Sequence, residues 1–325
     1  MSNIKKTLPF KGPFAGLLAD FVQEKRASGY KYETAVIYLC QLDDLLARQN
    51  ASTDCLTKEL VELWATKRPN EQVNTCFSRI CVSRQFACFL TRRGIPAYMA
   101  PQTHHAKYDF IPHIFTHEEI QKMFAELDGW SSFYRGADRH VVMPELFRVL
   151  YGCGLRIGEA VNLNRENVDL DEGVLIIKGA KFGKERMVPM ATSLTERLRI
   201  CAGKIGYSRP DSPFFPASPG TRLTHAIVYK TFRNILWKIG IPHIGRNHGP
   251  RVHDLRHTFA VHRLLQWYRE GADLNAMLPK LSTYLGHKDI SGTQRYLHLV
   301  ADLMPEVTAR LEKTVGHVIP GRDLP

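Results

Sequence analysis

The sequence predicts a mainly α-helical protein with a small antiparallel β-sheet, divided into two domains. Apolar residues recur at helical spacing through most of the first hundred positions and again in the second half of the chain. Two short runs, at 174–177 and 186–189, are typical of strands that pair across a turn. A proline-bearing stretch separates the two regions, and 325 residues are enough for two cores.

The first domain, residues 1–100, is expected to be a bundle of four or five helices. Apolar stripes at helical spacing predict helices over residues 14–29, 34–49, 57–64 and 74–93. Thr57 suits the start of the third helix, and Gly94 with Pro96 suits the end of the fourth. The polar faces of these helices carry cations, namely Lys25, Arg26, Lys31, Arg79, Arg84, Arg92 and Arg93. These cations either face solvent or contact the phosphates of a partner.

The stretch that joins the domains contains three prolines, Pro96, Pro101 and Pro112. We place the linker at residues 101–115. It is either an extended strap beside a partner or a passive tether.

The second domain, residues 116–304, begins at Thr116, which forms a capping box with Glu119. We expect helices over residues 117–127, 138–153, 193–201 and 226–239, another after Gly249, and a loop over 210–219. Lys181 lies in the glycine-rich turn between the two predicted strands. The tail, residues 305–325, opens with a short amphipathic helix over 305–315 that packs on its own domain or on a neighbouring copy.

The composition indicates the class of partner and the cellular compartment. Lysine and arginine exceed aspartate and glutamate by 44 − 32 = 12, which favours a polyanionic partner such as nucleic acid. The seven cysteines form no Cys-x-x-Cys pair, and Cys76, Cys81 and Cys88 are expected to pack in a core. No signal peptide or membrane span is visible, so a reducing, cytoplasmic setting is expected.

A candidate anion site lies in the predicted helix after Gly249. His253 and Arg256 are three residues apart and project from one helical face, while Leu255 and Phe259 can face a core. Arginine with histidine and little carboxylate is typical of phosphate binding. Tyr296 follows in a polar stretch that we expect to lie at the rim of the same site.

Five motifs in order resemble those of the tyrosine recombinase (phage integrase) family. They are Gly-Leu-Arg-x-x-Glu at 154–159, Lys181 in the hairpin, His-x-x-Arg at 253–256, Leu-Gly-His at 285–287, and Tyr296 nine residues later. The resemblance implies a DNA-binding, helical core-binding domain followed by a catalytic domain.

The resemblance also implies roles that suit the residue types. Guanidinium groups stay charged and hold phosphate oxygens in a fork, which suits Arg156 and Arg256. Tyr296 would be the nucleophile, activated by nearby cations. Lys181 would protonate the leaving 5′-oxygen, although Lys178 and Lys184 compete for that role. His253 and His287 would hydrogen-bond the scissile phosphate, and His253 can also take the tyrosine's proton.

The reaction implied by the resemblance is strand exchange on double-stranded DNA through a 3′-phosphotyrosine. No ATP, metal or other cofactor is required, because the ester keeps the bond energy. A synapse of four protomers, with tails exchanged between neighbours, and accessory recombination proteins are the implied partners. Glu159 is expected to orient Arg156 or the hairpin, while His257 and His298 are left outside the catalytic set.

One departure and three alternatives remain. The thirty residues between Arg256 and His287 exceed the usual spacing, so we expect a lengthened helix or loop there, as in integrases of mobile elements. The alternatives are a type IB topoisomerase, a DNA-binding regulator without catalysis, and a metal-dependent hydrolase that uses His253, His257 and His262.

Overall fold

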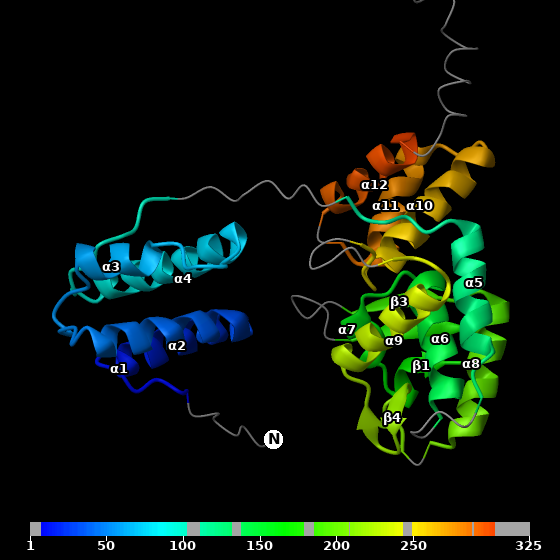
Figure 1. Cartoon of the computed structure of the whole chain (residues 1–325), viewed down its shortest axis with the longest axis horizontal. Helices are drawn as coiled ribbons and strands as arrows, with labels where there is room; N and C mark the ends of the chain where they lie inside the picture. The colour runs from blue at the N-terminus through cyan, green and yellow to red at the C-terminus, as the bar shows by residue number, and fades with distance from the viewer. Residues whose placement is uncertain are drawn as a thin grey trace, which may run out of the picture. The chain divides into compact units, whose positions relative to one another are not determined.

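The computed structural model describes residues 8–102, 111–131, 138–178, 185–207, 209–242, 249–287 and 289–302. The chain divides into two compact units, Met1–Phe110 and Ile111–Pro325, which Figure 1 shows in blue to cyan and in green to red. Helices dominate both units, and the strands form small antiparallel sheets in the second. The predicted fold class is confirmed.

Four helices make up the described part of the first unit: α1 (Ala15–Ala27), α2 (Glu33–Arg48), α3 (Lys58–Ala65) and α4 (Val73–Arg92). Thr57 accepts a hydrogen bond from the Leu60 N–H and so caps α3, as its sequence position predicted. Phe21 stacks obliquely on Phe86 and Phe89, with ring centroids 5.5 and 5.4 Å away, which joins α1 to α4 in a shared core.

Two expectations for α4 are wrong. Arg79 is fully buried rather than on a polar face, and its Nε donates to Glu71 Oε1 at 2.7 Å. Its guanidinium also donates to the carbonyl oxygens of Trp64 and Thr66. The pairing turns a surface cation into a structural one, because a buried charge needs a partner. Cys88 is exposed rather than in the core, and all seven cysteines are free.

The second unit carries eight α-helices within the residues described. They are α5 (His117–Asp128), α6 (Arg139–Gly152), α7 (Ile157–Val161), α8 (Thr192–Ile205), α9 (His225–Lys238), α10 (Asp254–Arg269), α11 (Leu274–Leu285) and α12 (Ser291–Asp302). In Figure 1, α10, α11 and α12 gather at one end of this unit and β4 lies at the other. The capping box of Thr116 with Glu119 is present at the start of α5.

A three-stranded antiparallel sheet links these helices, in the order β1 (Val168–Asp169), β2 (Val174–Ile177), β3 (Arg186–Pro189). The two predicted strands, β2 and β3, pair with Ile177 opposite Arg186. Their turn, with Lys181, lies outside the described residues.

A second, two-stranded sheet forms where the sequence predicted a loop. Strands β4 (Pro216–Ser218) and β5 (Thr221–Arg222) pair where residues 210–219 were expected to be loop. Each strand is too short to show a period of two, and the proline within β4 argues against a strand.

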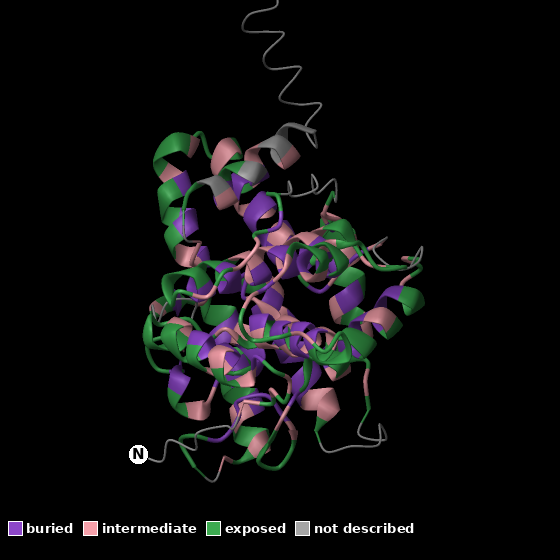
Figure 2. Cartoon of the chain, turned by 90° about the vertical axis from the view of Figure 1, so that its left-hand side faces the viewer, coloured by how far each residue is buried: buried purple, intermediate pink, exposed green. Residues whose placement is uncertain are grey.

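Two apolar clusters fill the second unit. The larger joins α5, α6, α8, α9 and the sheet, and the smaller joins α10, α11 and α12 around Phe259, Leu264 and Leu281. Figure 2 shows the result, with buried residues in purple alternating with exposed residues in green along the helices. The Phe115 N–H donates to Thr258 Oγ1 at 3.1 Å, which attaches the segment before α5 to α10. Among the helices described, none is both long and apolar enough to cross a membrane.

Candidate active site

The first turn of α10 sets the position of two predicted site residues. The buried Asp254 carboxylate accepts a hydrogen bond from the Arg251 backbone N–H at 2.9 Å and pairs with its guanidinium at 3.1 Å. Thr258 Oγ1 donates to the Asp254 carbonyl at 2.8 Å. His253 takes the N-cap position, and Arg256 follows within the first turn. Local hydrogen bonds therefore fix the direction in which both side chains leave the helix.

Arg256 is the most buried cation of the site, with 1% of its surface exposed. Its Nη1 donates to the Gly154 carbonyl at 2.8 Å and its Nη2 to the Leu285 carbonyl at 2.6 Å. Burial, followed by the charge of Arg156, lowers the pKa of Arg256 to about 10. The guanidinium therefore stays charged at neutral pH, and the nearby carboxylate of Glu159 lies 3.9 Å from its Nη1.

Arg156 meets Arg256 at the same stretch of backbone. It is the N-cap residue of α7, and its Nη2 donates to the Gly286 carbonyl at 3.2 Å, one residue beyond the carbonyl that Arg256 contacts. Its Nη1 pairs with Glu159 Oε1 at 2.8 Å. The Arg156 side chain is 40% exposed, so it can reach a ligand from outside. Two motifs a hundred residues apart thus converge on residues 285 and 286.

Glu159 is shared by three guanidinium groups. The guanidinium of Arg186, the first residue of β3, donates two hydrogen bonds of 2.9 Å to the Glu159 carboxylate. The guanidinium of Arg156 donates one more, and Arg256 Nη1 lies 3.9 Å from Glu159 Oε2. Burial raises the pKa of the Glu159 carboxyl, but the hydrogen bonds from Arg186 and Arg156 outweigh it and lower the pKa to about 2. One carboxylate facing three cations leaves an excess of two positive charges, which an anion such as a phosphate diester can balance.

Two glycines allow the backbone to come this close to the arginines. Gly154 has φ +59°, and an added Cβ would lie 2.5 Å from Phe259 Cδ1. Gly286 has φ +68°, and an added Cβ would lie 2.8 Å from Arg186 Nη1. Both positions require the left-handed conformation and leave no room for a side chain.

His287 follows directly after Gly286 and is oriented by α12. Its Nδ1 lies 2.7 Å from Thr293 Oγ1. Burial, then the charges of Arg256, Arg156 and His253, lowers the pKa of His287 to about 4. Desolvation of the ring by the surrounding protein, followed by the charges of Arg256, Arg251 and Arg156, lowers the pKa of His253 to about 4, although part of the residue remains exposed at the surface. Both imidazoles are therefore neutral at pH 7, and each can donate one hydrogen bond.

Tyr296, on α12, is buried with 3% of its surface exposed. The expectation that it lies at the rim of the site is therefore wrong, because α12 turns this residue toward α10 and the small apolar cluster. Its ring stacks on His287 at 6.1 Å, and its hydroxyl lies 3.1 Å from His257 Nδ1. The phenolate form of Tyr296 would raise the pKa of Arg256, so the two charges act on each other. Arg256 accordingly favours the phenolate.

Five of the six predicted site residues meet in this one place, at the contact of α7, α10, α11 and α12: Arg156, His253, Arg256, His287 and Tyr296. Lys181 lies outside the described residues, as does the side chain of His298. Within the described parts of the chain, no group of three or more His, Cys, Asp or Glu side chains is arranged to hold a metal ion. The set His253, His257 and His262 considered from the sequence is not such a group.

Three residues that contact the predicted site residues were not predicted from the sequence. His257 was set aside, although its spacing of four from His253 places it on the same face of α10. Arg186 and Thr293 gave no signal, because each acts through a residue distant in sequence.

The comparisons with known proteins agree with this geometry. Residues 113–302 match the phage integrase family. A Sinorhizobium fredii protein named as integrase/recombinase y4rB is 32% identical over 316 residues, covering 92% of this chain and 97% of that protein. The chain belongs to the tyrosine recombinase (phage integrase) family.

Other members of the family match shorter stretches. Tyrosine recombinase XerD of Pseudomonas aeruginosa is 34% identical over 169 residues, 51% of this chain and 52% of XerD. Among solved structures, XerH site-specific recombinase bound to palindromic difH substrate gives a TM-score of 0.60 at 18% identity, covering 86% of this chain and 78% of XerH. The Tn1549 transposon integrase in complex with transposon right end DNA gives 0.59 at 15%, covering 91% and 98%. These structures show a shared fold, and family membership supports site-specific DNA recombination as the class of activity.

Proposed function

We propose that this tyrosine recombinase cuts and rejoins double-stranded DNA through a covalent 3′-phosphotyrosine at Tyr296. The observation that carries the proposal is the convergence of Arg156 and Arg256 on the carbonyls of residues 285 and 286, next to His287, on which Tyr296 stacks. A phosphodiester resists nucleophiles because of its own negative charge, so a catalyst must first neutralise that charge. The unbalanced guanidinium groups of this site suit that task.

The chemistry follows from the side chains around the phosphate. Arg156 and Arg256 hold the non-bridging oxygens, and the neutral His253 and His287 donate hydrogen bonds to the same group. Tyr296 attacks the phosphorus in line with the 5′-oxygen, which leaves as a hydroxyl after taking a proton from Lys181. A 5′-hydroxyl from another duplex then attacks the phosphotyrosine and releases the enzyme.

Neither ATP nor a metal ion is part of the proposed reaction. The phosphotyrosine ester conserves the energy of the broken phosphodiester, so ligation needs no external source. The arginines supply the charge neutralisation that a metal would otherwise give.

The proposed assembly includes DNA and other copies of the chain. Residues 1–100 would contact DNA as a core-binding domain, and a net charge of +12 supports a polyanionic partner. Solved relatives of the same fold include recombinases bound to difH substrate and to transposon DNA. We infer a synapse of four protomers that exchange the tail, residues 305–325, and a natural substrate within a mobile element.

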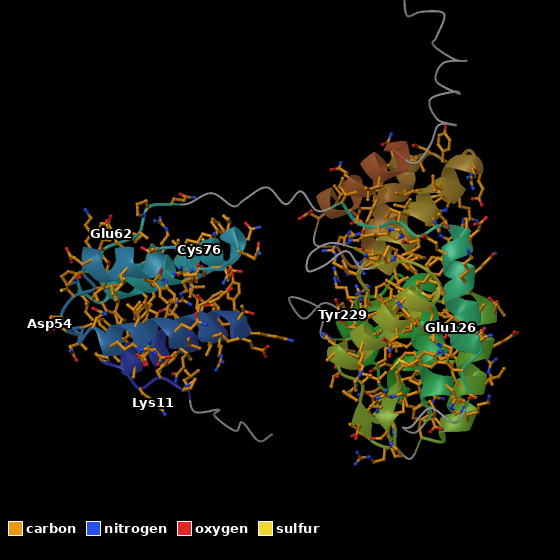
Figure 3. The ribbon with its side chains drawn as sticks, in the orientation of Figure 1. Lys11, Asp54, Glu62, Cys76, Glu126 and Tyr229 are labelled. Carbon is orange, nitrogen blue, oxygen red and sulfur yellow. The ribbon has the colours of Figure 1, made fainter. Side chains whose placement is uncertain are left out.

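Joined products distinguish a recombinase from a topoisomerase or from a DNA-binding regulator. Purified chain should join strands from two labelled duplexes taken from the flanks of its own gene, with EDTA present and ATP absent. Tyr296→Phe should bind the same DNA but join nothing. Tyr229→Phe is the control, because Tyr229 is exposed on α9 and labelled in Figure 3. Relaxed circles without joined duplexes would contradict the proposal, as would joining by Tyr296→Phe.

A further inference from the structure

The hydroxyl of Tyr296 has a hydrogen-bond partner that the proposed reaction has not used. His257 Nδ1 lies 3.1 Å from Tyr296 Oη, and the two ring centroids are 5.5 Å apart at an interplanar angle of 57°. The contact joins α10 to α12, which pack against each other. It is therefore held by two helices rather than by a loop.

The neighbouring histidines are poorly suited to accept a proton. The pKa of His253 and that of His287 both fall to about 4, through burial and through the charges of Arg256 and Arg156. A base that weak does not readily take a proton from a phenol, whose pKa is about 10. Neutral imidazoles of this kind suit donation to a phosphate oxygen instead. His257 lies one helical turn beyond His253, with ring centroids 4.8 Å apart.

We propose that His257 accepts the proton of Tyr296 as the phenolic oxygen attacks the phosphorus. This inference rests on the proposed function, because it assigns a step of that reaction. The O–H bond of Tyr296 breaks and an N–H bond forms at His257 Nδ1, while the Oη–P bond forms and the P–O5′ bond breaks. The leaving 5′-oxygen takes its proton from a separate acid, Lys181. In the reverse step His257 returns its proton to the departing phenolate.

The assignment fixes the tautomer of His257. Before the attack Nδ1 must be unprotonated so that it accepts the hydrogen bond from the Tyr296 hydroxyl, which places the ring proton on Nε2. A merely structural role would be satisfied by any side chain that hydrogen-bonds the hydroxyl. This difference makes the proposal testable by substitution.

The first experiment compares His257→Asn with His257→Ala in the single-turnover formation of covalent protein–DNA adduct on a nicked substrate. Asparagine can place an amide group near the position of Nδ1, but it cannot take a proton. Both variants should lose adduct formation by about 10²–10⁴-fold while binding DNA like the unchanged chain. Recovery to near the unchanged rate with His257→Asn would overturn proton acceptance and leave only a positioning role.

The second experiment makes the Tyr296 hydroxyl more acidic, so that its deprotonation depends less on a base. A fluorinated tyrosine at position 296 has a more acidic phenol, so its attack needs less help from His257. In the His257→Ala background it should restore adduct formation at least tenfold, while having little or opposite effect in the unchanged chain. Equal effects in both backgrounds would contradict the proposal. His262→Asn is the matched control, because His262 is another partly buried histidine of α10, and it pairs with Tyr151.

A measurement without DNA separates this inference from the proposed function. In ¹⁵N spectra of the full chain, Tyr296→Phe should shift the ring nitrogens of His257 but not those of His262. Absence of that shift would show that the hydrogen bond between His257 and Tyr296 does not form, which would overturn the inference. Absence of adduct from the unchanged chain, with the shift present, would instead contradict the proposed function and, with it, the proton transfer.

Discussion

At the scale of single residues, the two arginines of the site differ in how the fold uses them. Arg256 is buried and satisfies the carbonyls of Gly154 and Leu285, whereas Arg156 is partly exposed and pairs with Glu159. The first holds the site together, in addition to its proposed contact with phosphate. The second is freer to serve the substrate alone.

Substitution should separate these two roles. Arg256→Ala should lower the free energy of unfolding by on the order of 3 kcal/mol, because it leaves two carbonyls without their donor. Arg156→Ala should change it by less than about 1 kcal/mol, since that pair is partly exposed. Each change should slow adduct formation by at least about 10²-fold. Urea unfolding and single-turnover kinetics check both, and equal destabilisation by the two changes would contradict the distinction.

Residues whose chemistry carries a spacing signal could be selected from the sequence as members of one candidate site. Arg156, Arg256 and Tyr296 stood in motifs, and the structure brings them to one place. Sequence reasoning failed for Arg79, because helical periodicity cannot show that Glu71 folds back to pair with it. It also failed for the burial of Tyr296, because a polar stretch of sequence does not reveal which side of α12 faces α10.

At the scale of elements, the end of α11 is the part that assembles the site. The helix stops at Leu285, Gly286 turns the chain in a left-handed conformation, and His287 follows. The long segment after Arg256 proves to be a four-turn α10 and a separate α11, so the expected lengthening is taken up by helix. The sequence could not show that the added length leaves residues 285–287 beside α7.

A methyl group at Gly286 should damage this turn. Gly286→Ala forces a strained φ and places Cβ against Arg186, so we expect a loss of about 1–3 kcal/mol in the free energy of unfolding and slower adduct formation. Gly203→Ala is the control, because Gly203 lies within α8 and an added Cβ there meets nothing within 4 Å. That change should be neutral or stabilise the helix by up to about 1 kcal/mol. Thermal unfolding measures both, and similar effects would argue against a special role for the turn.

At the scale of the whole molecule, three histidines with partly desolvated rings make stability depend on pH. The pKa values of His253, His262 and His287 in the folded chain are about 4, lowered from an ordinary 6.5 by burial and by nearby positive or titratable groups. Protonation therefore favours the unfolded chain. The stabilisation is fully present above pH 6.5 and is lost as the pH falls from 6.5 to 4. The carboxyl groups of Glu71 and Glu159, whose pKa values are lowered from 4.5 to about 2, stabilise the folded chain above pH 4.5, and this stabilisation is lost as the pH falls from 4.5 to 2.

Anions bound at the site should weaken the dependence of stability on pH. Sulfate at Arg156 and Arg256 would offset the positive field and raise the pKa of His253 and that of His287, but not that of His262 beyond the site. Urea unfolding at pH 7, 6 and 5 should show falling stability, with a shallower fall in sulfate than in chloride at equal ionic strength. Stability that rises toward pH 5, or identical slopes in the two salts, would contradict the cationic site.

The residue that becomes joined to DNA is the most direct test of the whole account. The chain should be trapped on a nicked substrate in EDTA without ATP, digested with protease and nuclease, and sequenced by mass spectrometry. We predict a nucleotide attached through its 3′-phosphate to the peptide that contains Tyr296, and no such peptide from Arg256→Ala or Tyr296→Phe. Attachment at another residue, attachment through a 5′-phosphate, or cleavage without any attached peptide would contradict it.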